Sequence, residues 1–252
     1  MSPVEIKDFL AFTASHEIRT TIGFLCAMIF GILAYVEAVR LGWKHKTHAI
    51  PMFVVLYYFA NDFTYVALYN RWFHEVGDPH VYLGWYLYLP FPFLHSILAW
   101  QIINYSRHEV FPGATKIQAY LAYIAAQIAM LAFFWMITTL LNDYFLTISG
   151  MFTIIGSNMS IYLLSRRRTR KGQSLTFAWW QVFASGVINW FLFFPAYDPR
   201  LHGFGYYAFA TCICTLNLAY VFFLSRAPKY VPADDPHRNP AWGDNPPTTP
   251  IA

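Results

Sequence analysis

Residues 20–41 read TTIGFLCAMIFGILAYVEAVRL, and no charged residue occurs between Arg19 and Glu37. The apolar residues form a continuous block and not a stripe, and about 20 such residues are enough for a helix to cross the hydrocarbon core of a bilayer. The sequence therefore predicts an all-α integral membrane bundle of seven transmembrane helices. The predicted helices are 20–41, 50–70, 81–104, 117–140, 144–165, 175–196 and 203–225.

The composition agrees with a lipid environment and excludes several classes of protein. Hydrophobic residues make up 57% of the chain and charged residues only 12%, which is unlike an ordinary soluble domain. The net charge is +4, but the basic residues are divided among short loops, so we expect no nucleic-acid partner. The three cysteines lie inside apolar blocks and predict neither a disulfide framework nor a paired metal site.

The loops between the predicted helices alternate in basic content, and this sets the expected orientation. Lys and Arg are concentrated in the loops after the first, third, fifth and seventh helices, as in RRRTRK at 166–171. By the positive-inside rule the C-terminus is cytoplasmic and the N-terminus lumenal or extracellular. We therefore expect an N-terminal lumenal segment at 1–19, the membrane domain at 20–225 and a disordered, proline-rich cytoplasmic tail at 226–252.

Asp62 is the clearest candidate for a functional residue. It lies near the middle of the second predicted helix, where an ionisable group costs roughly 2.5–3.5 kcal/mol to insert. Helical spacing places Tyr58, Tyr65 and Tyr69 on the same face. Burial disfavours the charged carboxylate, so we expect a protonated Asp62 in an aromatic interior that acts as a general acid. The alternative is a carboxyl group that only joins two helices.

Other polar residues at membrane depth are weaker candidates for substrate binding. Gln181, Ser185 and Asn189 recur every four residues, and this stripe either lines a cavity or joins helices by hydrogen bonds. His95 and Asn217 are isolated, and a single intramembrane histidine is more often a packing residue than a ligand. Glu37 lies close enough to Arg40 to pair with it or to extend toward the membrane surface, which favours a structural role. Glu109, just beyond the third helix, is either a rim residue or a solvated charge.

Missing motifs exclude further classes. Residues 203–225 contain no lysine, so a retinal Schiff base is excluded. Only His95 is deep enough to ligate a metal or haem, and Asp62 has no carboxylate neighbours of the kind that hold magnesium diphosphate. We therefore expect no metal and no cofactor.

Five short stretches carry a family resemblance: YVEAVR at 35–40, KTHAIP at 46–51, NDF at 61–63, NYSRHE at 104–109 and TRKGQS at 169–174. With them the chain resembles the small seven-helix membrane-bound terpene cyclases of fungal meroterpenoid and indole-diterpene pathways, of the paxilline and pyripyropene type or the more divergent ascochlorin and ascofuranone type.

The resemblance implies roles for particular residues. Asp62 takes the place of an essential acid, and Asn61 stands where the family has Trp. The family's second acid corresponds to Asn217, an amide that orients a water or substrate oxygen but supplies no proton, with Asp198 as a possible substitute acid.

The resemblance also implies a reaction: cofactor-free, acid-initiated cyclisation of a prenyl chain, terminally epoxidised, on a meroterpenoid precursor. The expected partners are membrane lipids, the lipophilic prenylated substrate, and an upstream prenyltransferase and flavin epoxidase. In a fungal host the location would be the endoplasmic reticulum membrane. Two other functions remain open: a seven-helix transporter or small-molecule receptor that uses Asp62 as an intramembrane polar site, and a scaffold in which Asp62 only packs.

Overall fold

The computed structural model describes residues 3–143, 145–156 and 159–231, and every regular element within these ranges is a helix. The all-α prediction is confirmed for this part of the chain, while the predicted tail from residue 232 onward lies outside the described residues. In chain order the elements are α1 (Pro3–Ser15), α2 (Glu17–His45), α3 (Met52–Ala67), η1 (Arg71–Val76), α4 (Pro79–Tyr88), α5 (Pro90–Tyr105), α6 (Arg107–Val110), α7 (Lys116–Leu140), α8 (Thr147–Gly156), α9 (Ser160–Arg167), α10 (Leu175–Gln181), η3 (Val182–Phe193), α11 (Phe194–Tyr197) and α12 (Phe204–Arg226).

Five stretches are long and apolar enough to cross a membrane, and each coincides with a predicted transmembrane helix. They are Glu17–His45, Pro79–Tyr105, Lys116–Leu140, Leu175–Tyr197 and Phe204–Arg226. Large apolar side chains such as Ile117, Leu121 and Ile128 of α7 are exposed on the outside of the bundle. An apolar exterior of this kind is stable in lipid and not in water, which agrees with the membrane character inferred from the composition.

The other two predicted crossings take a different form. The helix expected at 50–70 is α3, which begins after Pro51 and ends at Ala67, so its 16 residues fall short of the usual membrane-spanning length. The helix expected at 144–165 is divided into α8 and α9. Proline fixes the backbone at the start of α3, because its ring locks φ and it has no N–H group. The seven-crossing count therefore stays a prediction.

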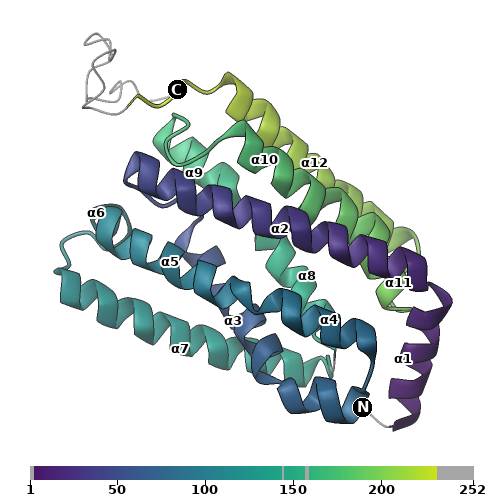
Figure 1. Ribbon diagram of the computed structural model, residues 1–252. Helices are drawn as coiled ribbons and strands as arrows, with labels where there is room; N and C mark the ends of the chain where they lie inside the picture. Colours follow the sequence, from purple (N-terminus) through teal and green to yellow (C-terminus); the bar gives the residue numbers. More distant parts are fainter. Residues whose placement is uncertain (1–2, 144, 157–158, 232–252) are drawn as a thin grey trace.

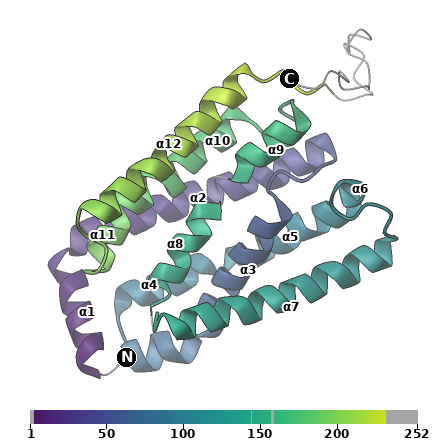
Figure 2. The ribbon, with the colours of Figure 1, turned by 180° about the vertical axis from the view of Figure 1, so that it is seen from behind.

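The short helices α3 and α8 occupy the interior of the bundle. Figures 1 and 2 show them between a layer formed by α2, α10 and α12 and a layer formed by α5 and α7. Helix α3 packs against α5, α7 and α8, and many of its residues are buried. Phe53 and Phe63 of α3 are exposed, but the face that carries Asp62 is buried against protein, and this burial allows α3 to carry polar side chains.

Two further predicted helices are interrupted where the sequence suggested continuous α-helix. The stretch predicted at 81–104 is α4 followed by α5, with the break at Leu89 and Pro90. Pro90 has no N–H group to donate to the preceding turn, which explains the break. The stretch predicted at 175–196 changes from α10 to the π-helix η3 and returns to α-helix at α11. A π-helix is wider than an α-helix and occurs often at functional sites.

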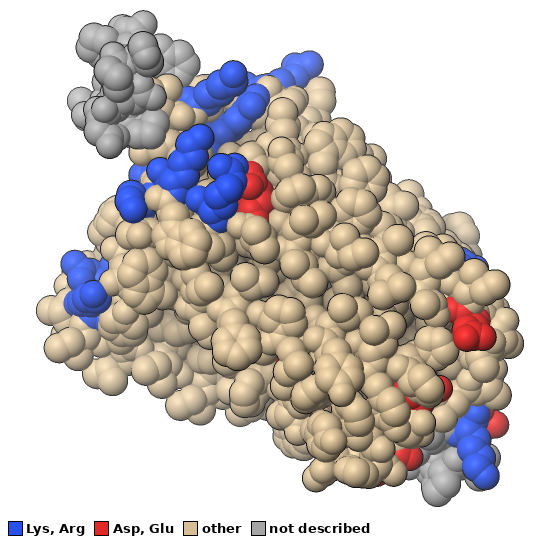
Figure 3. Space-filling view, viewed as in Figure 1, with Lys and Arg blue, Asp and Glu red and all other residues tan. Residues whose placement is uncertain are grey.

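Charged residues are concentrated at the two ends of the molecule. Figure 3 shows most Lys and Arg side chains at one end, and the long apolar flank between the ends is almost free of charge. At the basic end Arg167 donates to the His48 carbonyl and to Glu109, and Arg170 donates to the Ala227 carbonyl. Loops that are far apart in the sequence thus meet at one end, as expected from their shared basic character.

Candidate functional site

A cavity of about 160 Å³ lies in the interior of the bundle. Its walls come from α2, α3, α4, α5, α8, α10, η3 and α11, and they are largely apolar and aromatic. The aromatic side chains that line it include Phe24, Tyr35, Tyr58, Tyr65, Tyr88, Phe91, Phe177, Phe193, Phe194 and Tyr197. A concave, mostly apolar site with a few polar groups is the usual form of a small-molecule pocket.

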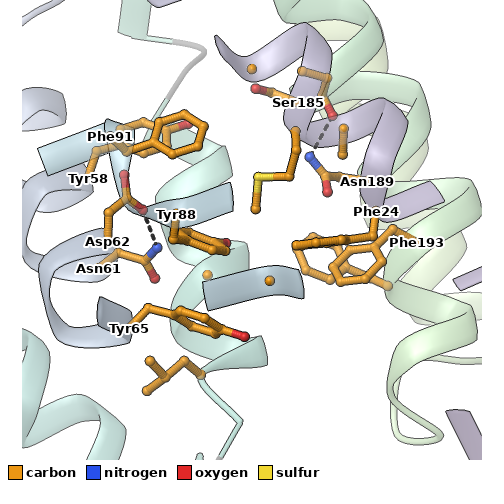
Figure 4. Close-up of a pocket in the computed structure, with 18 of the residues that line it drawn as sticks. Phe24, Tyr58, Asn61, Asp62, Tyr65, Tyr88, Phe91, Ser185, Asn189 and Phe193 are labelled. Atoms are coloured by element: carbon orange, nitrogen blue, oxygen red, sulfur yellow. Dashed lines mark hydrogen bonds between the residues drawn. The ribbon is translucent and has the colours of Figure 1, made fainter. Parts of the chain in front are cut away.

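Asp62 lies on the wall of this cavity that α3 forms, and its carboxyl group has two polar partners. Its side chain is almost fully buried. Oδ1 accepts a hydrogen bond of 2.8 Å from Nδ2 of Asn61 (Figure 4), and Oδ2 lies 2.7 Å from Nε2 of His95. Both partners reach Asp62 in a region that excludes water, where a hydrogen bond to an ionisable group is strong and its loss is costly.

His95 supports Asp62 from behind and is fully buried on α5. Its ring is enclosed by Tyr35 at 4.7 Å, edge to face, and by the stacked ring of Tyr58 at 6.0 Å. The second ring nitrogen, Nδ1, has no hydrogen-bond partner among the described residues. The aromatic enclosure fixes the imidazole, so His95 holds the Asp62 carboxyl group in one orientation.

Tyrosine rings extend the cavity away from Asp62. Tyr65 stacks on Tyr88 with ring centroids 4.4 Å apart and on Trp72 at 4.8 Å. Figure 4 shows Tyr88 and Tyr65 on the Asp62 side of the space, and Phe24 and Phe193 across from them. Stacked rings present rigid faces with a negative quadrupole, which attract a cation without reacting with it.

The wall formed by α10 and η3 carries the polar stripe predicted from the sequence. Gln181, Ser185 and Asn189 all line the cavity, so the cavity-lining interpretation of the stripe agrees with the geometry. Asn189 Nδ2 donates to the Ala184 carbonyl at 2.6 Å. Figure 4 places Ser185 and Asn189 across the space from Asp62 and Asn61.

The structure brings together most, but not all, of the residues predicted from the sequence. Tyr58 and Tyr65 line the cavity beside Asp62. Tyr69 does not: α3 ends at Ala67, the chain turns, and Tyr69 is 42% exposed and stacks on Phe73. The prediction that Tyr69 shares the Asp62 face is therefore wrong, because helical spacing holds only while the helix continues.

Asn217 also lies away from the cavity. It is buried on α12, where its Nδ2 donates to the Ile213 carbonyl one turn earlier, and it packs near Gly186 of η3. The residue at the position of the second acid in the resembled family therefore packs between α12 and η3 and does not line the cavity that contains Asp62. Its sequence position on a helix gave no information about which neighbour that helix would meet.

The weaker acidic candidates are all paired. Glu37 forms a bidentate ion pair with Arg40 and accepts a hydrogen bond from Ser174, and Asp198 forms an ion pair with Arg200. These carboxylates do not line the cavity, and Asp198 is therefore not placed to replace a second acid there.

Glu109 belongs to a network at the basic end. Burial raises the pKa of its carboxyl group, but the charge and hydrogen bond of Arg167 outweigh burial and leave the pKa below its usual value. Burial, and then the charge of Arg167, lower the pKa of His48 to about 3. Glu109 is thus a charged structural partner in a loop network and not a rim acid of the cavity.

Most of the aromatic residues that line the cavity were not predicted from the sequence, and neither was the contact between Asn61 and Asp62. Tyr88 and Phe24 are ordinary aromatic residues in apolar blocks, and nothing local distinguishes them. Asn61 was noted only for its family position, although its side chain donates to Asp62. An amide next to an intramembrane acid was the available signal, since such an acid requires hydrogen-bond donors.

The chain has no match among known family models, curated proteins or solved structures. Within the described ranges no three His, Cys, Asp or Glu side chains come close enough to hold a metal ion. The arrangement of Asp62, His95 and the aromatic walls is therefore the basis for a functional assignment.

Proposed function

We propose that the protein is a membrane-embedded terpene cyclase that cyclises a prenyl chain by protonation and a carbocation cascade. One observation carries the proposal: the Asp62 carboxyl group, held by Asn61 and His95, lies on the wall of an interior cavity lined by aromatic rings. A proton donor surrounded by cation-stabilising faces and shielded from water is what such a reaction requires.

The Asp62–His95 pair is suited to hold a transferable proton. A carboxylate and a neutral imidazole together carry one negative charge, whereas the same pair with one more proton is neutral overall. The 2.7 Å contact between Oδ2 of Asp62 and Nε2 of His95 allows the two groups to share one proton. His95 then acts as a positioning residue that keeps the proton of the pair beside the cavity.

The reaction starts with transfer of this proton to the oxygen of a terminal epoxide. The carbon–oxygen bond breaks and leaves a hydroxyl group and a tertiary cation, which neighbouring alkenes attack to form rings. Loss of a proton from carbon ends the cascade, so the product is an isomer of the substrate. Asp62 is the only carboxylate among the described residues that line the cavity. Its conjugate base accepts the final proton, directly or through a water, and the acid is restored.

The size of the cavity favours binding of the reacting end of the chain. An engineered cavity of about 150 Å³ accommodates benzene. A space of about 160 Å³ therefore accepts one or two isoprene units beside Asp62. Desolvated aromatic faces such as those of Tyr58 and Tyr88 stabilise a nearby cation by up to about 2 kcal/mol each.

We also propose seven crossings, with the N-terminus lumenal and the C-terminus cytoplasmic. The meeting of the basic loops at one end supports this orientation, with α3 and the α8–α9 pair as the two additional passes. The endoplasmic reticulum membrane is the proposed location. A prenyltransferase and a flavin epoxidase would supply the substrate.

The test is conversion of a farnesylated phenol terminal epoxide by microsomes that contain the protein. Wild type should give an isomer of unchanged mass and shifted retention, and Asp62→Asn should lower the rate by about 10²–10⁴-fold. Asp8→Asn, which removes an exposed acid on α1, is the matched control and should keep full activity. Asn217→Ala should also convert the substrate, because Asn217 lies away from the cavity.

Conversion that survives in Asp62→Asn would contradict the assigned acid. A wild-type protein that accumulates but converts neither epoxidised nor unepoxidised substrates would contradict the cyclase itself. The transporter or receptor function would then be tested by solute flux and ligand binding.

A further inference from the structure

The cavity has a second polar region on the wall opposite Asp62. Gln181 ends α10, and Ser185 and Asn189 follow on η3, so two consecutive helical elements present polar side chains to the same space. Figure 4 shows Ser185 and Asn189 separated from Asp62 by the aromatic rings. The cavity is thus polar at two walls and apolar between them.

The side-chain oxygen of Gln181 has no hydrogen-bond partner among the described residues. The residue is only 6% exposed, and its Oε1 is buried without a hydrogen bond to any described residue. The Oγ1 atom of Thr21, on α2, is also buried without a partner at the same cavity. A buried polar group left without a hydrogen bond costs about 1–3 kcal/mol. Both groups would be satisfied by a ligand with a hydrogen-bonding atom.

The side chain of Asn189, unlike that of Gln181, is held by a hydrogen bond, which supports a binding role for this wall. Its Nδ2 is committed to the Ala184 carbonyl, which fixes the side-chain amide. The π-helical geometry of η3 is itself unusual and is common at ligand sites. The fixed amide of Asn189 and the unpartnered amide oxygen of Gln181 lie on the same wall. Together they give a preorganised polar surface for an oxygen-containing group of a ligand.

We propose that Gln181 binds an oxygen atom in the part of the substrate that does not react. The substrate class is then a bifunctional terpenoid: an epoxide or alkene at one end meets Asp62, and a hydroxyl or carbonyl oxygen separated from it by an apolar chain meets Gln181. This inference rests on the proposed function, since it orients the substrate of that same cavity. Two anchored ends select one folded conformation of the chain.

The experiment compares two ligands that differ by one hydroxyl group: a farnesylated phenol and the corresponding farnesylated benzene. Dissociation constants are measured with purified protein in detergent, by quenching of tryptophan fluorescence. Wild type should bind the phenol about 5–10-fold more tightly. Gln181→Leu should reduce this preference to less than about 2-fold. Asp62→Asn should keep it, because that variant leaves the opposite wall intact.

Two results would overturn the proposal: equal binding of both ligands by wild type, as expected if water occupies the polar wall, or an unchanged preference in Gln181→Leu. If Gln181→Leu does not accumulate, the unbranched variant Gln181→Met takes its place and should lower the preference. Binding and conversion are separate measurements. A hydroxyl preference without conversion would contradict the cyclase activity and support the oxygen site at Gln181. Conversion without the preference would support the cyclase activity and contradict the oxygen site.

Discussion

Replacing either member of the Asp62–His95 pair alone should destabilise the protein more than replacing both. Asp62→Leu leaves the His95 imidazole buried without its 2.7 Å partner, and His95→Phe leaves the carboxyl group with Asn61 alone. Loss of one partner of a buried pair costs about 3–5 kcal/mol. Removal of both polar groups leaves neither unpaired, so the double variant should lie within about 1–2 kcal/mol of wild type.

The assay is a double-mutant cycle on purified protein in detergent micelles, with unfolding by denaturant followed by tryptophan fluorescence. We expect a coupling free energy of about 4–9 kcal/mol, because the losses of the two single variants are largely recovered in the double variant. The control cycle combines Asp62→Leu with His108→Phe, which replaces an exposed histidine of α6, and should be additive. If the Asp62–His95 cycle is also additive within about 0.5 kcal/mol, the two residues do not form the pair on which the proposed site depends.

Three further predictions concern helix packing and pH. An added Cβ at Gly42 would overlap the buried Gln101 amide, so Gly42→Ala should lower the free energy of unfolding by about 1–3 kcal/mol. A Cβ at Gly23 would lie 3.1 Å from the η3 backbone, so Gly23→Ala should also lower the melting temperature. Gly31→Ala, with its nearest contact at 3.7 Å, is the control for both, and equal melting temperatures would contradict the packing argument. The pKa of His48 is lowered to about 3, so its contribution to stability is complete above about pH 6.5 and is lost as pH falls toward 3. His48→Asn should reduce the loss of stability between about pH 6.5 and pH 3. An unchanged loss in this variant would contradict the assignment of the loss to His48.

The sequence was sufficient for the helical class and for the approximate positions of the helices. Continuous apolar blocks such as 20–41 and 117–140 form helices in lipid because each backbone polar group must be satisfied within its own segment. The requirement is local, so it can be recognised without knowledge of the neighbouring helices. Interruptions were harder to predict, since the π-helix at Val182–Phe193 depends on packing and not on a residue type.

Asp62 was recognisable from the sequence for an equally local reason: an acid in the middle of an apolar block is costly wherever the helix lies. Its partners were not recognisable. His95 is 33 residues away in the chain and becomes a partner only because α5 packs against α3, while Asn217 and Tyr69 are directed elsewhere. The sequence alone determined that the chain forms apolar helices and that one of them carries a buried acid, because the cost of polar groups in lipid is set residue by residue. Only the tertiary structure decided which side chains face that acid, because this depends on how separate helices pack against one another.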